Sequence, residues 1–218
     1  MDFIKNNRLN FQSLPHTEIL SVTSGKGGVG KTSISVNLAI LFKQYRKRVL
    51  LVDADVHLGN VDLVLGIRPT LTMSDVILGK KELRETIVSG PGEIDILPAS
   101  SGVLELLESD ETLIKKLNRA FQSFENKYDI ILVDTGAGLS PNVLSFVASS
   151  NRTLLVVTPD PSSIADAYGM IKVMARIQPD QPVILLTNMV ASLEEGKSLF
   201  QKLNLMTTRF LNFKLEHG

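Results

Sequence analysis

The sequence predicts a doubly wound α/β fold, in which helices cover both faces of a mainly parallel sheet. Three observations favour this fold. Short β-rich apolar runs alternate with longer stretches of helical periodicity. Most of these runs are continuously apolar, as expected for strands that are buried on both faces. A glycine-rich loop joins the first run to the first helical stretch, and ligands of such folds bind beyond the carboxyl ends of the strands.

The expected elements alternate along the chain. Strands are expected at 18–23, 48–53, 94–99, 128–134, 153–158 and 182–187, and helices at 31–45, 102–126, 162–177 and 194–213. The first helix carries an apolar stripe, which predicts the face that it buries. The stripe consists of Ile34, Leu38, Leu41, Phe42 and Tyr45.

The last expected helix carries apolar residues at spacings of four and three, with basic residues beside them. The apolar residues are Leu199, Leu203, Met206, Phe210 and Phe213, and the basic ones are Lys197, Lys202 and Arg209. The pattern is compatible with a helix lying on a membrane and with a helix packed on the sheet. The packed helix is favoured, because a doubly wound fold needs one at this position.

Composition and charge indicate one globular domain without a strong electrostatic preference for a partner. A chain of 218 residues with 44% hydrophobic residues is long enough to bury one core. We expect an N-terminal extension at 1–17 and a single domain at 18–218. Lys+Arg and Asp+Glu both number 23, so no net charge attracts nucleic acid or an anionic membrane.

Two absences in the sequence exclude whole classes of protein. The chain has no cysteine, which excludes disulfides, thiolate iron–sulfur clusters and cysteine zinc sites. It has no apolar run long enough to span a membrane, and the start of the chain lacks the apolar core of a signal peptide. A cytoplasmic protein is therefore expected.

The glycine-rich loop "GKGGVGKT" at 25–32 matches the phosphate-binding pattern G-x-x-x-x-G-K-[ST]. Glycines in such a loop let backbone N–H groups point at phosphate oxygens, and the start of the following helix adds a partial positive charge. Lys31 is placed to reach the β- and γ-phosphates, and Thr32 to bind Mg²⁺. The predicted nucleotide-binding segment comprises Gly25, Gly27, Gly28, Val29, Gly30, Lys31, Thr32 and Ser33.

Three carboxylates follow the ends of expected strands. Asp53 and Asp55 lie in "VDADVHLGN", and Asp134 begins "DTGAG". A phosphate-bound Mg²⁺ needs acidic groups nearby, directly or through its waters. We therefore predict a metal site of Thr32, Asp53 and Asp134, although any one of these aspartates taken alone could be a solvated loop residue.

Two further strand ends suggest where a base would lie. Asn188 in "TNM" offers an amide that suits an adenine edge, and the backbone at Pro159 and Asp160 in "TPDPSS" could form a wall beside it. A turn and a helix cap are equally good explanations of the second segment.

Lys26 is a second lysine in the loop, where phosphate binding requires only Lys31. It stands at the mouth of the loop. The residues leave two interpretations open, an idle surface lysine or a cation that reaches a phosphate held by a second subunit, as arginine fingers do.

The loop, with Lys26 as its extra lysine, resembles the deviant Walker A loop of the MinD/ParA family of ATPases, and the similarity extends from about residue 18 to the end of the chain. The resemblance implies a homodimer formed with ATP and Mg²⁺, in which Lys26 crosses the interface to the partner's phosphates. It implies catalytic roles for Lys26, Lys31 and Asp55, with Asp55 acting on the attacking water, and an adenine contact for Asn188.

Within that family, the segment from Asn60 to Gly66 with Arg68, and the segment 98–106, resemble the FlhG branch of flagellar-number regulators. This finer resemblance implies a slow ATPase, stimulated by a partner or lipid, that controls flagellar number and placement. It implies an FlhF-like GTPase and flagellar basal-body components as partners, and a peripheral position at the inner face of the cell membrane when ATP is bound.

Three features depart from the FlhG pattern. The chain lacks a DQAxxLR-like start, so stimulation of an FlhF-like GTPase does not follow from the resemblance. His57 and Gly59 stand in "DVHLGN", where relatives carry other small or polar residues. The sequence ends at "FKLEHG" without a visible C-terminal strand or membrane helix, so we expect the family's membrane anchor to be missing from it.

Three other functions are alternatives to a flagellar ATPase. An iron–sulfur reductase with the same loop is excluded by the lack of cysteine. A ParA-type partition ATPase needs a basic surface for DNA, but the basic clusters at 46–48, 80–81 and 115–116 are scattered, so nucleic acid is not an expected partner. A small-molecule ligase or kinase of this fold would consume ATP without a protein partner.

Overall fold

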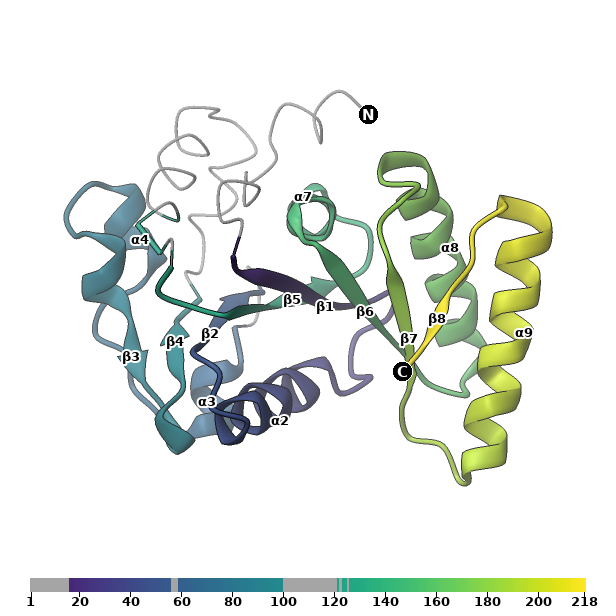
Figure 1. Cartoon of the computed structure of the whole chain (residues 1–218), viewed down its shortest axis with the longest axis horizontal. Coiled ribbons are helices and arrows are strands. Elements are labelled where there is room, and N and C mark those ends of the chain that lie inside the picture. Colours follow the sequence, from purple (N-terminus) through teal and green to yellow (C-terminus); the bar gives the residue numbers. More distant parts are fainter. Residues whose placement is uncertain (1–15, 56–58, 100–120, 122, 125) are drawn as a thin grey trace.

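The computed structural model describes residues 16–55, 59–99, 121, 123–124 and 126–218. Within them, eight strands form one sheet in the order β3-β4-β2-β5-β1-β6-β7-β8 (Figure 1). All neighbours pair in parallel except β3 and β4, which confirms the predicted mainly parallel sheet. The strands are β1 Glu18–Ser24, β2 Val49–Ala54, β3 Val88–Ser89, β4 Asp95–Leu97, β5 Ile130–Ala137, β6 Arg152–Val157, β7 Val183–Thr187 and β8 Glu216–His217.

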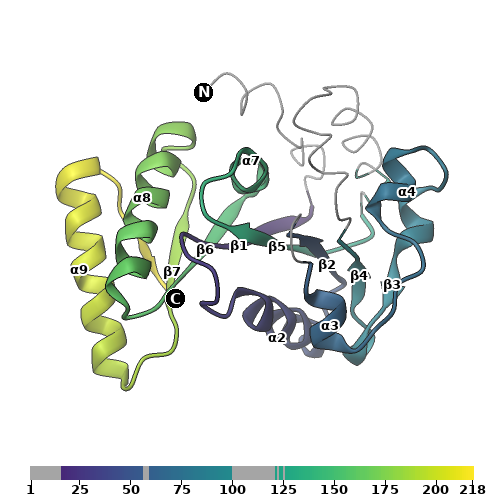
Figure 2. The same cartoon turned by 180° about the vertical axis from the view of Figure 1, so that it is seen from behind.

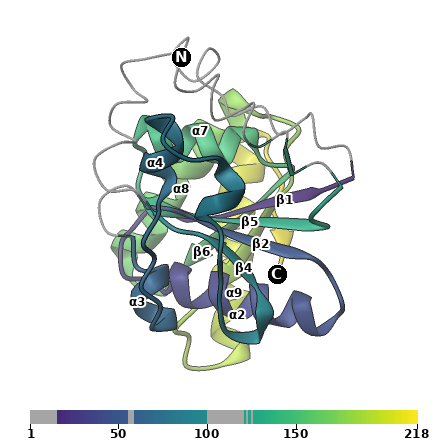
Figure 3. The same cartoon turned by 90° about the vertical axis from the view of Figure 1, so that its left-hand side faces the viewer.

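Helices cover both faces of the sheet, as the doubly wound fold requires. They are α2 Lys31–Gln44, α3 Val61–Leu65, α4 Met73–Ile77, α7 Pro141–Ser149, α8 Pro161–Ile177 and α9 Leu193–Leu211, with short 3₁₀ turns at Leu83–Thr86 and Pro91–Glu93. Figure 3 shows α4 and α7 on one side of the central strands and α2 and α3 on the other. Figure 2 shows α8 and α9 beside β6 and β7, at the opposite end of the sheet from β3 and β4.

The central strands bring the predicted acidic residues to one edge. All six residues of β2 are buried, as a strand covered on both faces should be. In the parallel register, Asp53 of β2 lies opposite Asp134 of β5, and Asp134 lies opposite Val22 of β1. The carboxyl ends of β1, β2 and β5 therefore meet at the edge where the glycine-rich loop begins.

The predicted apolar stripe of the first helix is confirmed in part. Ile34, Leu38 and Phe42 are partly buried and pack against the core, whereas Leu41 and Tyr45 are exposed. The fully buried residues of α2 are Lys31, Ser35, Val36 and Ala39. Lys31 has to point into the loop, and this fixes the rotation of the helix about its axis. Small side chains then face the sheet and allow the helix to approach it closely.

Five helices and strands of the described residues lie where none was expected, namely α3, α4, α7, β3 and β8. Helix α7 begins at Pro141 with Ser140 as its N-cap, whose Oγ accepts the N–H of Val143 at 3.4 Å. The Ser-Pro pair is a start signal that could have revealed this helix.

Near the end of the sequence, Glu216 and His217 form a strand that pairs with β7, so the expectation of no strand there was wrong. Two residues are too few to show a periodic pattern. The helix expected at 102–126 lies almost entirely outside the described residues. His57 also lies outside them.

The last helix packs on the sheet, as the sequence analysis favoured. Leu199, Leu203 and Phe213 are buried, whereas Met206 and Phe210 of the same predicted stripe are exposed. No helix of the described part of the chain is long and apolar enough to cross a membrane.

Two leucines of α9 give a matched test of this packing. Leu203 has no exposed surface and Leu205 is 67% exposed. Leu203→Ala should lower the free energy of unfolding by about 2–5 kcal/mol, because it leaves a cavity. Leu205→Ala should change it by no more than about 0.5 kcal/mol. Urea unfolding of both variants measures this, and equal losses would show that the helix packs through a different face.

Candidate nucleotide-binding site

A pocket of about 780 Å³ opens at the carboxyl edge of the sheet, over the glycine-rich loop. Its lining combines the loop, the start of α2, the region after β2, the last residue of β5 and one residue that follows β7. The lining residues are Gly27, Gly28, Gly30, Lys31, Thr32, Ser33, Asp55, Asn60, Leu63, Val64, Ala137 and Met189. Six of the eight predicted loop residues thus line one hollow of a size that suits a small ligand, whereas Gly25 and Val29 lie outside its lining.

Two loop positions require glycine. Gly30 adopts a φ of 94° just before α2, and a Cβ there would stand 2.6 Å from Nδ2 of Asn188. Gly25 packs on α8, where a Cβ would lie 2.4 Å from the carbonyl carbon of Asp166. No side chain caps the start of α2, so its first N–H groups face the pocket, as anion-binding helix ends do.

Lys31 is held inside the loop. Its side chain is buried, and its Nζ donates a hydrogen bond to Oγ of Ser24 at 3.0 Å. Burial lowers the pKa of the ammonium group, and the charges of Asp134 and Asp55 oppose that shift. Phosphate oxygens would add to these negative charges and so favour the charged form of Lys31.

Asp134 is buried beneath the loop and held from α2. Its Oδ1 accepts a hydrogen bond from Oγ of Ser35 at 2.9 Å, and the carboxylate also accepts one from the side chain of Thr32. Burial raises the pKa of Asp134, while these two hydrogen bonds lower it. Thr32 and Asp134, two of the three predicted metal ligands, thus lie in contact.

Asp53 is buried at the end of β2, on the strand next to Asp134, and binds the backbone of the segment that follows β2. Its carboxylate accepts the N–H groups of Asp55 and Val61, each at 3.2 Å. Burial, together with the charges of Asp134 and Asp55, raises the pKa of Asp53 to about 7. A divalent cation would favour the ionised forms of both buried aspartates, because its charge offsets their desolvation.

Asp55 lies against the end of β5. A Cβ on Gly136 would stand 3.4 Å from Oδ1 of Asp55, so the carboxylate faces the "DTGAG" segment. Asp55 and Ala137 both line the pocket, across from Lys31. This arrangement suits a carboxylate that orients a water beside a bound phosphate.

The described residues contain no group of three or more His, Asp or Glu side chains that could hold a metal by themselves. Mg²⁺ at phosphate sites usually keeps several waters and uses one or two carboxylates together with phosphate oxygens. A hydroxyl at Thr32 with two carboxylates close behind it fits this requirement.

The residues predicted to hold a base lie beside the phosphate pocket, outside its lining. Nδ2 of Asn188 donates to the carbonyl oxygen of Val29 at 2.8 Å, and Asn188 also borders a hollow of about 310 Å³ beside α2. That hollow is mostly apolar, with Ile34, Leu38 and Leu41 in its wall. Pro159 and Asp160 lie at the start of α8.

Lys26 binds the start of α8 within its own chain. Its Nζ donates to the carboxylate of Asp160 and, at 2.7 Å, to Oγ of Ser162. The hydrogen bond from Lys26 is the largest of the effects that lower the pKa of Asp160 to about 2. Neither contact could be expected from the sequence, because Lys26 and Asp160 are 134 residues apart.

Several residues of the site were missed. Ser35 stands four positions after Lys31 on one face of a helix, a spacing that could have identified it. Ser24 precedes the loop and contacts both of its lysines, since its Oγ also donates to the carbonyl oxygen of Lys26 at 2.6 Å. Asn60 and Met189 lie in segments that the sequence had singled out, but only the fold shows that these two residues line the pocket.

Comparison with known proteins agrees with this geometry. Residues 17–185 match the family model described as an AAA domain. The chain is 42% identical over 205 residues to the antiactivator FleN of Pseudomonas aeruginosa, which covers 94% of this chain and 73% of the relative. It is 33% identical over 202 residues to the flagellum site-determining protein YlxH of Helicobacter pylori, covering 92% and 67%.

Solved structures give the same family. The septum site-determining protein MinD of Pyrococcus horikoshii, complexed with Mg-ADP, is 32% identical with a TM-score of 0.64, covering 78% of this chain and 70% of the other. The chain belongs to the MinD/ParA family of P-loop ATPases, in the branch that includes FleN and YlxH. This family binds ATP and ADP with Mg²⁺, and the MinD structure of Pyrococcus horikoshii holds Mg-ADP.

The raised pKa of Asp53 predicts a pH effect on the protein without nucleotide or metal. The pKa is about 7 in the fold and about 4 in an unfolded chain. Between these values the folded protein binds the proton at Asp53 and the unfolded chain does not. The contribution of Asp53 to stability is therefore fully present below about pH 4 and is lost as the pH rises to about 7.

Asp53→Asn should remove this part of the pH dependence, which amounts to at most about 1.4 kcal/mol for each pH unit. Urea unfolding of both proteins between about pH 5 and about pH 8 measures the difference. Parallel stability curves for the two proteins would mean that Asp53 does not titrate in this range.

Proposed function

We propose that this protein is an ATP-dependent dimerisation switch whose hydrolysis of ATP controls flagellar number and placement. The observation that carries the proposal is the second loop lysine, Lys26, which directly precedes Gly27 of the pocket lining. The similarity to the flagellum site-determining protein YlxH and to the antiactivator FleN supports the flagellar role.

In the proposed site, the loop N–H groups, Lys31 and Ser33 hold the phosphates of ATP. Mg²⁺, held by Thr32 with Asp53 and Asp134 behind it, would neutralise the charge of the phosphates. Asp55 orients the attacking water from the end of β2. The base lies on the side of Asn188, Pro159 and Asp160, beside the apolar hollow along α2.

Lys26 completes the site of a second protomer. Its side chain is 42% exposed, so a neighbouring subunit can reach it. A cation that arrives only with the partner stabilises the transition state only in the dimer, which makes hydrolysis a property of pairs. Association then starts the cycle and hydrolysis ends it.

The finer parts of the proposal rest on the FlhG resemblance. Turnover is slow and is stimulated by a partner or lipid. The partners are an FlhF-like GTPase and flagellar basal-body components, and the ATP-bound dimer lies at the inner face of the membrane through a C-terminal helix outside this sequence. The ATPase domain comprises 18–218, after an extension at 1–17.

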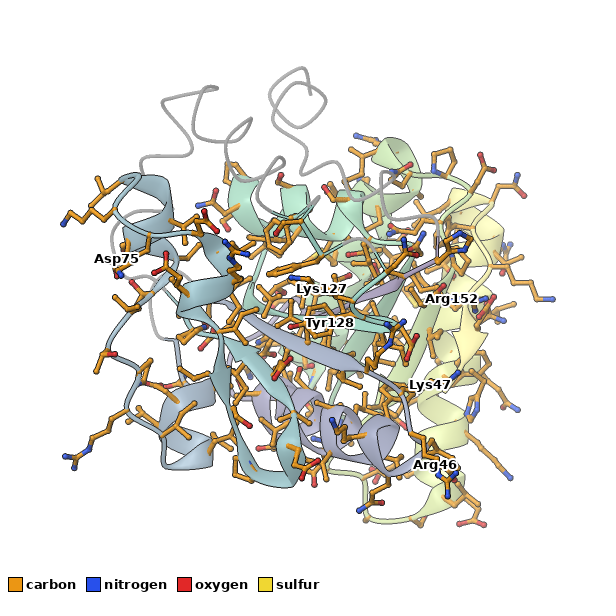
Figure 4. All side chains as sticks on the ribbon, turned by 60° about the vertical axis from the view of Figure 1, so that its left-hand side comes forward. Arg46, Lys47, Asp75, Lys127, Tyr128 and Arg152 are labelled. Atoms are coloured by element: carbon orange, nitrogen blue, oxygen red, sulfur yellow. The ribbon has the colours of Figure 1, made fainter. Side chains whose placement is uncertain are left out.

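The second candidate is a positioning ATPase of cell division or partition, which the similarity to MinD proteins favours. A version acting on DNA needs a continuous basic surface. Here Arg48 pairs with Asp129 at 2.6 Å, and Lys81 pairs with Glu85 at 3.0 Å. Figure 4 shows Arg46 and Lys47 together at one end of the molecule, away from Lys127. Steeply salt-dependent DNA binding in the presence of ATP would favour this candidate.

The switch is tested with three single variants. Asp55→Ala should form a stable dimer with ATP and Mg²⁺ and lower kcat by at least about 100-fold, because it removes the group that orients the water. Lys26→Ala should weaken both association and turnover, and Lys31→Ala should lose nucleotide binding. Size-exclusion chromatography and phosphate release measure these effects. An Asp55→Ala protein that binds ATP and stays monomeric would contradict the switch.

A further inference from the structure

The start of α8 forms a closed polar cluster around the ammonium group of Lys26. Asp160 and Ser162 both accept its hydrogen bonds, and Oγ of Ser162 donates to Oδ2 of Asp160 at 2.8 Å. The three side chains thus bond to one another in a triangle. Asp160 precedes the first turn of the helix and Ser162 lies within it, so both partners belong to one rigid element.

The loop and α8 are fixed against each other, so this cluster is preformed. Gly25, the residue before Lys26, lies so close to the backbone of Asp166 that no side chain would fit between them. The carbonyl oxygen of Lys26 accepts a hydrogen bond from Ser24, which anchors the backbone of the lysine as well. Only the side chain of Lys26 is left to change its position.

An ammonium group held in this way is directed at its own chain. In the proposed dimer the same group has to reach the phosphates of the neighbouring protomer, and it cannot make both sets of contacts at once. The triangle of Lys26, Asp160 and Ser162 therefore competes with association.

We propose that Asp160 and Ser162 are positioning residues that hold Lys26 within its own protomer, and that their release sets the concentration at which two ATP-bound protomers associate. This inference rests on the proposed function. The contact between Lys26 and Asp160 would oppose dimerisation, because the phosphates of the partner have to displace Asp160 from Lys26 before the dimer can form.

The size of the effect follows from the exposure of the pair. Both side chains are 42% exposed, and partly exposed ion pairs contribute little to stability. Loss of one such pair should change an equilibrium about two- to five-fold. Each dimer releases two of them, so the dissociation constant of the dimer should change about four- to twenty-five-fold.

The experiment uses the Asp55→Ala protein with ATP and Mg²⁺. This variant is expected not to hydrolyse ATP, so the dimer keeps its nucleotide during the measurement. Analytical ultracentrifugation gives the dissociation constant of the dimer for this parent and for Asp160→Asn, Asp160→Glu and Asp166→Asn in the same background. Asp160→Asn removes the charge that attracts Lys26, and Asp160→Glu restores it. Asp166→Asn removes an equal charge from the same helix, also beside the loop, and serves as the matched control.

We expect Asp160→Asn to associate about four- to twenty-five-fold more tightly than the parent, with Asp160→Glu and Asp166→Asn close to the parent. In a Lys26→Ala background, the gain from Asp160→Asn should disappear, because no ammonium group remains to be released. Titration of fluorescent ATP at concentrations where all proteins are monomeric shows whether Asp160→Asn acts through nucleotide affinity instead.

Three outcomes would overturn the inference. If the parent dimerises and Asp160→Asn binds no more tightly, Lys26 is not restrained and the switch itself stands. If Asp166→Asn gives the same gain, the effect is one of general charge. If no variant associates with ATP, the proposed function fails and this inference fails with it.

Discussion

The burial of an ammonium group beside two carboxylates, at the edge where three parallel strands end, is the constraint on which the site depends. Asp53 and Asp134 are brought side by side by the register of β2 and β5, and both are almost completely buried. Lys31 is buried above them at the start of α2. Each charge would be costly to bury alone. Together they partly offset one another, and bound phosphate and Mg²⁺ would favour the ionised forms of all three groups.

The glycine-rich loop is held by contacts with three other parts of the molecule, so a movement of this short segment would affect each of them. The N–H of Gly138 after β5 donates to the carbonyl oxygen of Ser24 at 2.9 Å. The amide of Asn188 after β7 donates to Val29, and α8 packs against Gly25. A movement of the loop on phosphate binding would thus be transmitted by direct contacts to the "DTGAG" segment, to Asn188 and to the start of α8. Lys26 lies in the last of these contact regions.

The sequence predicted the parts of the site that depend on local pattern. The loop, the strands and the acidic strand ends follow from glycine spacing and apolar runs, and Lys31, Thr32, Asp53, Asp55 and Asp134 all lie at the predicted edge. It could not predict the rotation of α2, because the loop rather than the apolar stripe sets it. It also could not predict the partners of Lys26, since Asp160 is 134 residues away and only the pairing of β1 with β6 brings it near. The antiparallel β3 and the two-residue β8 were missed because each is too short for a periodic pattern.

The central claim is that Lys26 acts in the site of the neighbouring protomer, and mixing two inactive variants tests it most directly. In a mixed dimer of Lys26→Ala with Asp55→Ala, the Lys26→Ala protomer keeps its own Asp55 and receives an intact Lys26 from its partner. One of the two sites is then complete, so phosphate release should appear on mixing and reach about half the activity of the wild-type dimer per mixed dimer. If Lys26 acts within its own chain, each protomer lacks one essential group. A mixture that stays as inactive as its components, while the two proteins are shown to associate, would contradict the account.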